Sequence, residues 1–266
     1  MRDDVDLLMA VRAPAPYLEE TLASVCAQTH ANWRLIAVVD GRDDEVVEML
    51  TRMVPADRLD LCVIEQNVGL VRALNTGLAR ARAPFVARMD ADDRCRPERL
   101  AVQVSWMLGH PEHAMVGTAA ALIDAQGAAL GRRIGSEVED ADVREGLLWR
   151  NQFVHPSVMI RRAALGELRY APAALHREDY ELWLRLAARA RLANLPDELL
   201  EYRVSEGQTS SKPVPLASLR AVHAARRTLA RSLGTGRLRT VMAGAAWSGA
   251  QTRFYRNRMG RLRGVA

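Results

Sequence analysis

The sequence predicts an α/β fold whose first half is a doubly wound, Rossmann-like sheet. Apolar strand segments and amphipathic helix segments alternate four times before residue 100. One of the strand segments, residues 33–39, is almost continuously apolar, which is typical of a strand buried on both faces of a parallel sheet. After residue 213 the chain becomes basic and predicts a helical C-terminal extension.

Each element of the first half is predicted by its local sequence. The predicted strands cover residues 5–11, 33–39 and 59–64, and a fourth begins at Phe85. The predicted helices cover residues 17–28, 43–53 and 70–81. Pro14 ends the first strand, Asp43 can cap the second helix, and Gly69 turns the chain into the third. Pro97 is typical of the first turn of a further helix.

Acidic residues stand where two of these strands end. Asp40 follows the second strand, and Asp90, Ala91, Asp92 and Asp93 follow the fourth. Ligands of open α/β sheets bind at the carboxyl ends of strands, so these acids can face one crevice. In an extended chain Asp90 and Asp92 point to the same side, and a divalent cation carrying phosphate oxygens would offset their repulsion. The alternative is a solvated acidic turn.

The second half is expected to contain further strands and two helices. Strands are expected between residues 110 and 133 and over 199–204, with turns at 124–127 and at Gly131, and a helix over 140–149. His155 precedes a proline, which favours extended geometry. It is either a hydrogen-bonding residue of an acceptor site or a structural histidine.

The second of these helices begins near Asp179. Asp179 shares a face with Leu182, Trp183 and Leu186, so its carboxylate is expected to point inwards from the first turn. Glu181 and the following arginines are expected on the other side. An acid in this position is either a simple N-terminal helix acid or a general base.

Composition limits the class of protein. The chain has 266 residues, enough for one large domain or a domain with an appendage. Three cysteines without a CxxC pair indicate reduced thiols, with neither a zinc site nor a disulfide framework. Acids interrupt the apolar N-terminal segment, and no segment reaches about 18 apolar residues. Neither a signal peptide nor a membrane span is therefore expected.

Basic charge is concentrated at the C-terminus. Residues 214–266 hold 11 arginines and no aspartate, glutamate or lysine, although the whole chain has a net charge of only +5. An apolar stripe at helical spacing lies opposite several arginines and consists of Leu219, Val222, Ala225, Leu229 and Leu233. This helix can pack on the rest of the protein, or lie on an anionic membrane. Nucleic-acid binding is not expected, because aromatic residues are sparse here and no recognition motif is present.

Four ordered motifs resemble the family 2 glycosyltransferases of the GT-A fold. They are VVDG at 38–41, NVGLVRALNTGLARA at 67–81, MDADD at 89–93 and RPERL at 96–100. The resemblance extends from about residue 5 to residue 211. It implies a mixed central sheet, with a nucleotide-sugar-binding half over 1–100 and an acceptor-binding half over 101–213. The basic helical extension, 214–266, lies outside this domain.

The resemblance also implies roles for the donor-site residues. Asp40 would contact the base or ribose of a nucleotide-sugar, with a UDP-sugar as the expected donor. The Asp90-Ala91-Asp92 motif would hold the nucleotide, and its two acids would hold Mg2+ or Mn2+ on the diphosphate. Arg72 is either a donor to the diphosphate or an exposed helix arginine.

On the acceptor side, the resemblance implies that Asp179 is the general base. Glu178 would support it or bind the acceptor, and His155 would contact the acceptor. The reaction would invert the anomeric carbon by direct displacement. Many relatives have a histidine near the metal where this chain has Ser205, so a third protein ligand is not expected there.

The sequence therefore predicts an inverting, metal-assisted glycosyltransferase. It would move a sugar from a nucleotide-diphosphate sugar to a hydroxyl of a surface glycan or a lipid-linked acceptor. The alternatives are a nucleotidyltransferase, disfavoured because residues 12–14 contain no glycine, and a non-catalytic nucleotide- or glycan-binding module on the same fold. The expected location is the cytoplasm, either free or peripheral on the inner face of the membrane.

Overall fold

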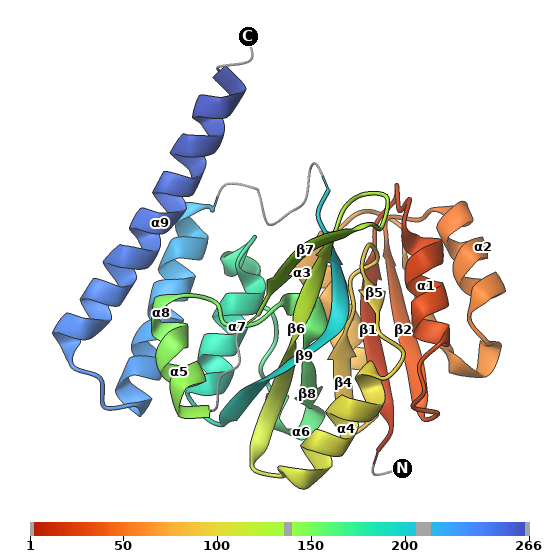
Figure 1. Cartoon of the computed structure of the whole chain (residues 1–266), viewed down its shortest axis with the longest axis horizontal. Helices are drawn as coiled ribbons and strands as arrows, with labels where there is room; N and C mark the ends of the chain where they lie inside the picture. Colours follow the sequence, from red (N-terminus) through yellow and green to blue (C-terminus); the bar gives the residue numbers. More distant parts are fainter. Residues whose placement is uncertain (1–2, 136–139, 206–213, 264–266) are drawn as a thin grey trace.

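One mixed sheet forms the centre of the protein, with helices on both of its faces (Figure 1). The computed structural model describes residues 3–135, 140–205 and 214–263. Within these residues nine strands form the sheet, in the order β3-β2-β1-β4-β8-β6-β9-β5, and β7 pairs with β6. The strands are β1 (Val5–Val11), β2 (Trp33–Asp40), β3 (Leu59–Ile64), β4 (Phe85–Arg88), β5 (Arg94–Cys95), β6 (His113–Ile123), β7 (Ala129–Ile134), β8 (Met159–Arg161) and β9 (Arg191–Arg203).

The helices connect these strands and then continue as the C-terminal extension. They are α1 (Leu18–Cys26), α2 (Asp44–Met53), α3 (Leu70–Arg80), α4 (Arg99–Gly109), α5 (Asp140–Trp149), α6 (Arg162–Leu165), α7 (Glu178–Ala187), α8 (Leu216–Ser232) and α9 (Arg237–Arg263). Three short 3-10 helices are η1 (Ala56–Arg58), η2 (His155–Ser157) and η3 (Pro172–Ala174).

The first half is the predicted parallel sheet. β1 pairs in parallel with β2 and with β4, and β2 pairs in parallel with β3. Leu7 and Leu8, adjacent residues of β1, point to opposite faces and are both buried, as expected of a strand covered on both sides. Asp43 caps α2 as predicted, since its Oδ1 accepts the Val46 N–H at 3.0 Å.

The second half makes the sheet mixed. β8 is antiparallel to β4 and to β6, whereas β9 runs parallel to β6. β5 is antiparallel to β9, so a residue pair from the first half is hydrogen-bonded to the last strand. This pairing places the segment after β4 beside the end of β9.

Two apolar cores lie on the two faces of the sheet. Leu7 and Leu35 belong to the core under α1, α2 and α4, with Leu22 and Leu100 among its helical members. Leu8 and its neighbours on the other face belong to the core under α3, α5, α7 and α8. Successive side chains of β1 point to opposite faces of the sheet, so they pack against two different layers of helices.

Two turn predictions were wrong in detail. Pro97 was expected in the first turn of a helix, but α4 begins two residues later, at Arg99. The Pro97 carbonyl accepts the Thr29 N–H at 2.8 Å and so does not take part in the hydrogen bonds of the helix. Gly131 does not reverse the chain but lies inside β7, where it has a φ of 60°. The pairing of β6 with β7 shifts register there, so the glycine is accommodated in a β-bulge.

The C-terminal extension packs against the helical layer that contains α7 (Figure 1). Val222, Ala225 and Leu229 of α8 are buried, so the apolar stripe faces the protein. Of the two alternatives for this helix, packing on the rest of the protein is therefore the one that the structure has. α9 lies beside α8 and α5 and then extends beyond the body of the protein. Among the described residues, we find no helix whose length and apolar content would let it cross a membrane.

Candidate functional site

Three carboxylates gather directly after β4. Asp90, Asp92 and Asp93 each place a carboxylate oxygen within 4.8 Å of the others. The strand itself ends at Arg88, and residues 91 and 92 form a turn. The predicted alternation of an extended chain therefore does not explain why Asp90 and Asp92 are close. The turn brings them together and adds Asp93, which the sequence did not single out as a ligand.

The electrostatics of this cluster favour a cation. Burial, followed by the charge of Asp90, raises the pKa of Asp92 to about 6. Burial also raises the pKa of Asp93 well above its ordinary value, and the other two acids raise it further. Oδ2 of Asp93 is buried and has no hydrogen-bond partner among the described residues. Clustered carboxylate oxygens, one of them without a hydrogen-bond partner among the described residues, fit Mg2+ or Mn2+.

Three buried arginines, Arg88, Arg99 and Arg203, hold the acidic turn. Arg88 forms an ion pair with Asp90. Arg203, at the end of β9, donates its backbone N–H to Oδ1 of Asp93 and its Nε to the Asp92 carbonyl, both at 2.8 Å. Arg99 donates Nη2 to the Arg88 carbonyl at 2.8 Å. The turn is thus fixed by residues from three separate elements.

Asp40 holds the loop that leads into α3. Its carboxylate accepts the backbone N–H groups of Val68 at 2.7 Å and Gly69 at 2.9 Å, and Nδ2 of Asn67 at 3.2 Å. Only 4% of Asp40 is exposed. The visible role of Asp40 is therefore to fix the start of α3, and its contact with a base or ribose stays a prediction. Arg72 lies exposed in the first turn of that helix.

His155 pairs with a tyrosine that sequence reasoning missed. Nε2 of His155 lies 2.9 Å from the Tyr170 hydroxyl. The predicted extended geometry of His155 is wrong, because His155 begins η2, and Val154 is the extended residue. The side chain of Asn75 clamps Tyr170 by accepting its N–H at 3.0 Å and donating to its carbonyl at 2.8 Å. Tyr170 is thereby fixed to α3.

The charges of both acidic groups of the site act on the Tyr170 hydroxyl. Burial raises the pKa of its hydroxyl, and the charges of Asp179, Glu178 and Asp90 raise it further. Burial lowers the pKa of His155 well below the ordinary value, and the charge of Arg88, which acts on Tyr170 as well, lowers it further. Acids that are almost 90 residues apart in sequence therefore act on one hydroxyl.

Glu178 and Asp179 stand in the first turn of α7, as predicted. Oδ2 of Asp179 accepts Nδ2 of Asn151 at 2.7 Å. Only 6% of Glu178 is exposed, and its Oε2 has no hydrogen-bond partner among the described residues. Burial, with the charge of Asp179, raises the pKa of Glu178 to about 7, and burial raises that of Asp179.

The two faces of α7 are not as different as its sequence predicted. Leu182, Trp183 and Leu186 are buried, which confirms the inward face. Glu181 was expected on the solvent side, but only 5% of it is exposed. α8 covers this side of α7, and Glu181 is neutralised there by Arg185 at 2.7 Å. The prediction for Glu181 was therefore wrong because of tertiary packing, which a helical pattern does not show.

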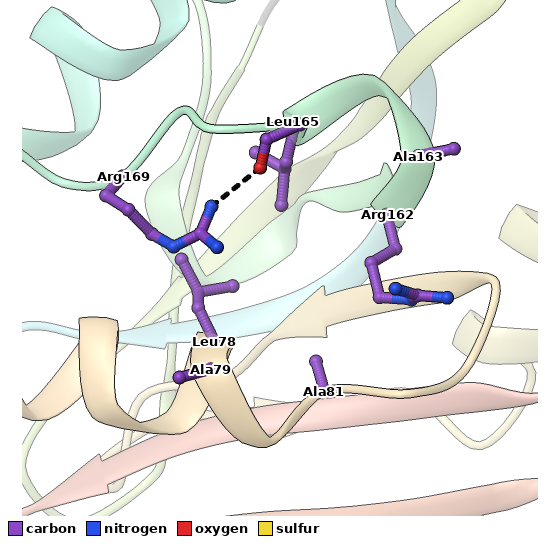
Figure 2. A pocket seen from close by; sticks show the side chains of 8 residues that line it. Leu78, Ala79, Ala81, Arg162, Ala163, Leu165 and Arg169 are labelled. Atoms are coloured by element: carbon purple, nitrogen blue, oxygen red, sulfur yellow. Dashed lines mark hydrogen bonds between the residues drawn. The ribbon is translucent and has the colours of Figure 1, made fainter.

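A separate cavity of about 280 Å3 lies at the C-terminal end of α3 (Figure 2). Leu78 and Ala79 of α3 line one side, and Leu165 and Arg169 line the other. Arg169 donates to the Gly166 carbonyl at 2.8 Å. None of the predicted site residues lines this cavity, so it is not part of the site that the acids form.

Residues 7–168 match the sequence pattern of the family described as Glycosyl transferase family 2. The chain belongs to glycosyltransferase family 2. It is 34% identical over 197 residues to the amylovoran biosynthesis glycosyltransferase AmsE of Erwinia amylovora, covering 73% of each chain. It is also 30% identical to the O-antigen biosynthesis glycosyltransferase WbnJ of Escherichia coli, covering 78% of this chain and 82% of that one.

Two solved structures share the fold of this family 2 protein. S. aureus TarS 1-349 in complex with UDP-GlcNAc superposes with a TM-score of 0.70 at 17% identity, over 92% of this chain and 70% of that one. The mannosyltransferase PcManGT from Pyrobaculum calidifontis, in complex with GDP-Man and Mn2+, gives a TM-score of 0.63 at 19% identity, over 98% and 88%. The predicted GT-A fold is confirmed.

Proposed function

We propose that this glycosyltransferase transfers a sugar with inversion from a nucleotide-diphosphate sugar, preferably a UDP-sugar, to an acceptor hydroxyl. The observations that support this best are the three clustered carboxylates after β4 and the buried Glu178–Asp179 pair, in which Asp179 accepts from Asn151. We place the donor diphosphate at the acids after β4 and the acceptor hydroxyl at the Glu178–Asp179 pair, so that the two substrates would be neighbours. Residues 1–100 would then bind the donor and residues 101–213 the acceptor.

In this proposal, Asp90 and Asp92 hold Mg2+ or Mn2+, which would neutralise charge on the departing diphosphate. Asp179 accepts the proton of the acceptor hydroxyl. The hydroxyl oxygen bonds to the anomeric carbon as the bond from that carbon to the diphosphate breaks, and the nucleoside diphosphate leaves with the electron pair. Glu178 and His155 bind or orient the acceptor, and Arg72 donates to the diphosphate from the first turn of α3.

We further propose that the acceptor is a growing surface polysaccharide or its lipid-linked precursor. AmsE and WbnJ are named for the biosynthesis of amylovoran and O-antigen, and this chain covers at least 73% of each. TarS and PcManGT carry UDP-GlcNAc and GDP-Man in their complexes, so the donor base is open to test.

The proposal is tested by calorimetric titration of the protein with UDP, GDP, dTDP and CDP, each with and without Mn2+. We expect one nucleotide to bind, and to bind more tightly with Mn2+, because metal and diphosphate share the acidic turn. The sugar derivatives of that nucleotide are then tested for transfer. If no nucleotide binds under any metal condition, the chain would be a binding module without donor chemistry.

We also propose that the enzyme contacts an anionic membrane through α9. Because the stripe of α8 is buried, it cannot be the contact surface. The outward face of α9 exposes Leu238, Val241 and Met242 by 75%, 67% and 55%. α9 contains seven arginines and no acidic residue. An apolar face on a basic helix fits a bilayer of anionic lipid.

Exchanging these three apolar residues for glutamine is expected to abolish co-sedimentation with phosphatidylglycerol vesicles, because the face would lose its apolar contact with the bilayer. Leu216→Gln is the matched control, since Leu216 is an apolar residue of α8 with 61% exposure. Binding of the unchanged protein to net-neutral phosphatidylcholine vesicles shows how much the contact depends on the negative charge of the lipid. Equal binding by the triple variant and the unchanged protein would contradict the membrane contact.

A further inference from the structure

The N-cap position of α7 provides no side-chain cap for the helix. Its N-cap residue, Arg177, makes no side-chain capping hydrogen bond. The preceding residue, His176, has a φ of 66°, in the left-handed region that few residues other than glycine adopt. Glu178 and Asp179 follow at once, and the charge of Asp179 opposes ionisation of Glu178. A helix start with these features needs support from outside the helix.

That support comes from the C-terminal extension. Arg226 of α8 donates Nη2 to the Tyr180 hydroxyl at 3.1 Å and Nε to the Leu148 carbonyl at 2.7 Å. The Tyr180 hydroxyl in turn donates to the Leu147 carbonyl at 2.6 Å. Arg226 therefore ties α8 to the end of α5 and to the residue that follows Asp179.

α9 contacts the same turn of α7 at the residue that precedes Glu178. Nη2 of Arg177 donates to Oε1 of Gln251 at 2.6 Å. The Trp247 ring lies 5.7 Å from the Tyr180 ring. Residues on both sides of the Glu178–Asp179 pair are thus held by α8 or α9, and Figure 1 shows the three helices packed together.

Arg226 is an unusual cation for a stability role alone. Only 1% of it is exposed, and among the described residues no carboxylate forms an ion pair with it. Its guanidinium instead lies over the rings of Trp247 and Tyr180, at 5.0 Å and 5.8 Å. A buried charge that is satisfied by one carbonyl, a hydroxyl, the Nδ1 of His223 at 3.0 Å and two ring faces depends strongly on their geometry. It therefore fixes the position of Tyr180 closely.

We propose that the α8–α9 extension is a positioning element of the active site, which holds the Glu178–Asp179 pair through Arg226–Tyr180 and Gln251–Arg177. Arg226 and Gln251 are positioning residues, because they touch the neighbours of the pair and not the reacting atoms. The inference rests on the proposed function in one respect, that Asp179 is the base. Loss of the extension would then impair the chemical step more than donor binding.

Arg226→Lys is the principal test, because it keeps the charge and loses the planar fork. We expect kcat to fall about 10- to 100-fold, since small misplacements of a catalytic group have effects of this size. KM for the donor and the calorimetric Kd of its nucleotide are expected to stay unchanged. Gln251→Ala should change kcat in the same direction. Arg227→Lys is the matched control, because Arg227 is the exposed neighbour on the same helix.

Hydrogen–deuterium exchange of the peptide over residues 176–187 gives a readout that does not depend on activity. We expect faster exchange in Arg226→Lys and in Tyr180→Phe, and no change in Arg227→Lys. A double-mutant cycle between Arg226→Lys and Tyr180→Phe should be non-additive in kcat, because both variants break one contact.

Two results would overturn the inference. The first is unchanged exchange and unchanged kcat in Arg226→Lys. The second is a parallel loss of kcat, nucleotide binding and melting temperature, which would make Arg226 a residue of general stability. Failure of the proposed base is distinguishable, since Asp179→Asn would then retain kcat while the exchange measurement still reports on the extension.

Discussion

Asparagine in place of Asp179 is expected to lower kcat by about 10²- to 10⁴-fold, the range that general bases contribute. The amide has the shape of the carboxylate, and its oxygen can still accept the hydrogen bond from Asn151. It cannot, however, accept a proton from the acceptor hydroxyl. The calorimetric Kd for the donor nucleotide should stay unchanged, because the proposed diphosphate site lies on the acids after β4.

The pH dependence of the unchanged enzyme gives an independent check on Asp179. Burial raises the pKa of this carboxyl, and a carboxylate base is active only when ionised. With donor and Mn2+ at saturation, kcat/KM for the acceptor is therefore expected to fall as the pH decreases through that raised pKa, and the part of this acidic limb that Asp179 causes should be absent in Asp179→Asn. An unaltered kcat in the variant would make Asp179 a simple N-terminal helix acid.

Glu178→Gln separates the two members of the pair. The Glu178 pKa of about 7, caused first by burial and then by Asp179, makes this group sensitive to the same pH range. If Glu178 binds the acceptor, the glutamine variant should raise KM for the acceptor and retain most of kcat. A larger loss of kcat in Glu178→Gln than in Asp179→Asn would reverse the assignment of base and support.

Local patterns were sufficient to predict the parallel half of the fold. Continuous apolar strands, the cap at Asp43 and the inward face of α7 depend on residues within one or two turns of each other. The acids at the ends of β2 and β4 followed from the rule that parallel strands end at one edge. Those predictions required no knowledge of which elements meet later in the chain.

Long-range packing decided what the sequence did not predict. Tyr170 and Asn75 meet across 95 residues, and Arg203 reaches Asp93 across 110 residues. Glu181 looked solvent-facing because the helix that covers it, α8, follows it in the chain. One signal was available: an arginine at the end of an otherwise apolar strand, such as Arg88, is rarely buried without a polar partner.

Asparagine in place of Asp92 is expected to weaken Mn2+-dependent nucleotide binding by about 100-fold or more, because even residues that only orient a metal ligand contribute 10- to 100-fold. The variant keeps the turn, since the Asp92 carbonyl that accepts from Arg203 is part of the backbone. Calorimetry with and without Mn2+ measures the change. Asp57→Asn is the control, because Asp57 is an exposed acid of η1.

The pKa of Asp92 also predicts how binding changes with pH. A metal ligand must be ionised, and the pKa of this carboxyl in the metal-free protein is about 6. Affinity for the metal and nucleotide is therefore expected to fall as the pH drops below about 6. Unchanged affinity at lower pH would mean that Asp92 does not bind the metal.

The same substitution should stabilise the metal-free protein at pH 7. The folded-state pKa of Asp92 lies above its ordinary value of 3.8, so at pH 7 the ionised group favours the unfolded chain. Asparagine removes this unfavourable charge, and the melting temperature should rise, whereas saturating Mn2+ should stabilise only the unchanged enzyme. A lower melting temperature without metal would indicate that Asp92 is a structural acid. The variant is thus expected to be more stable without metal and to bind the nucleotide more weakly. These opposite effects are expected of a cluster of like charges whose function is metal binding.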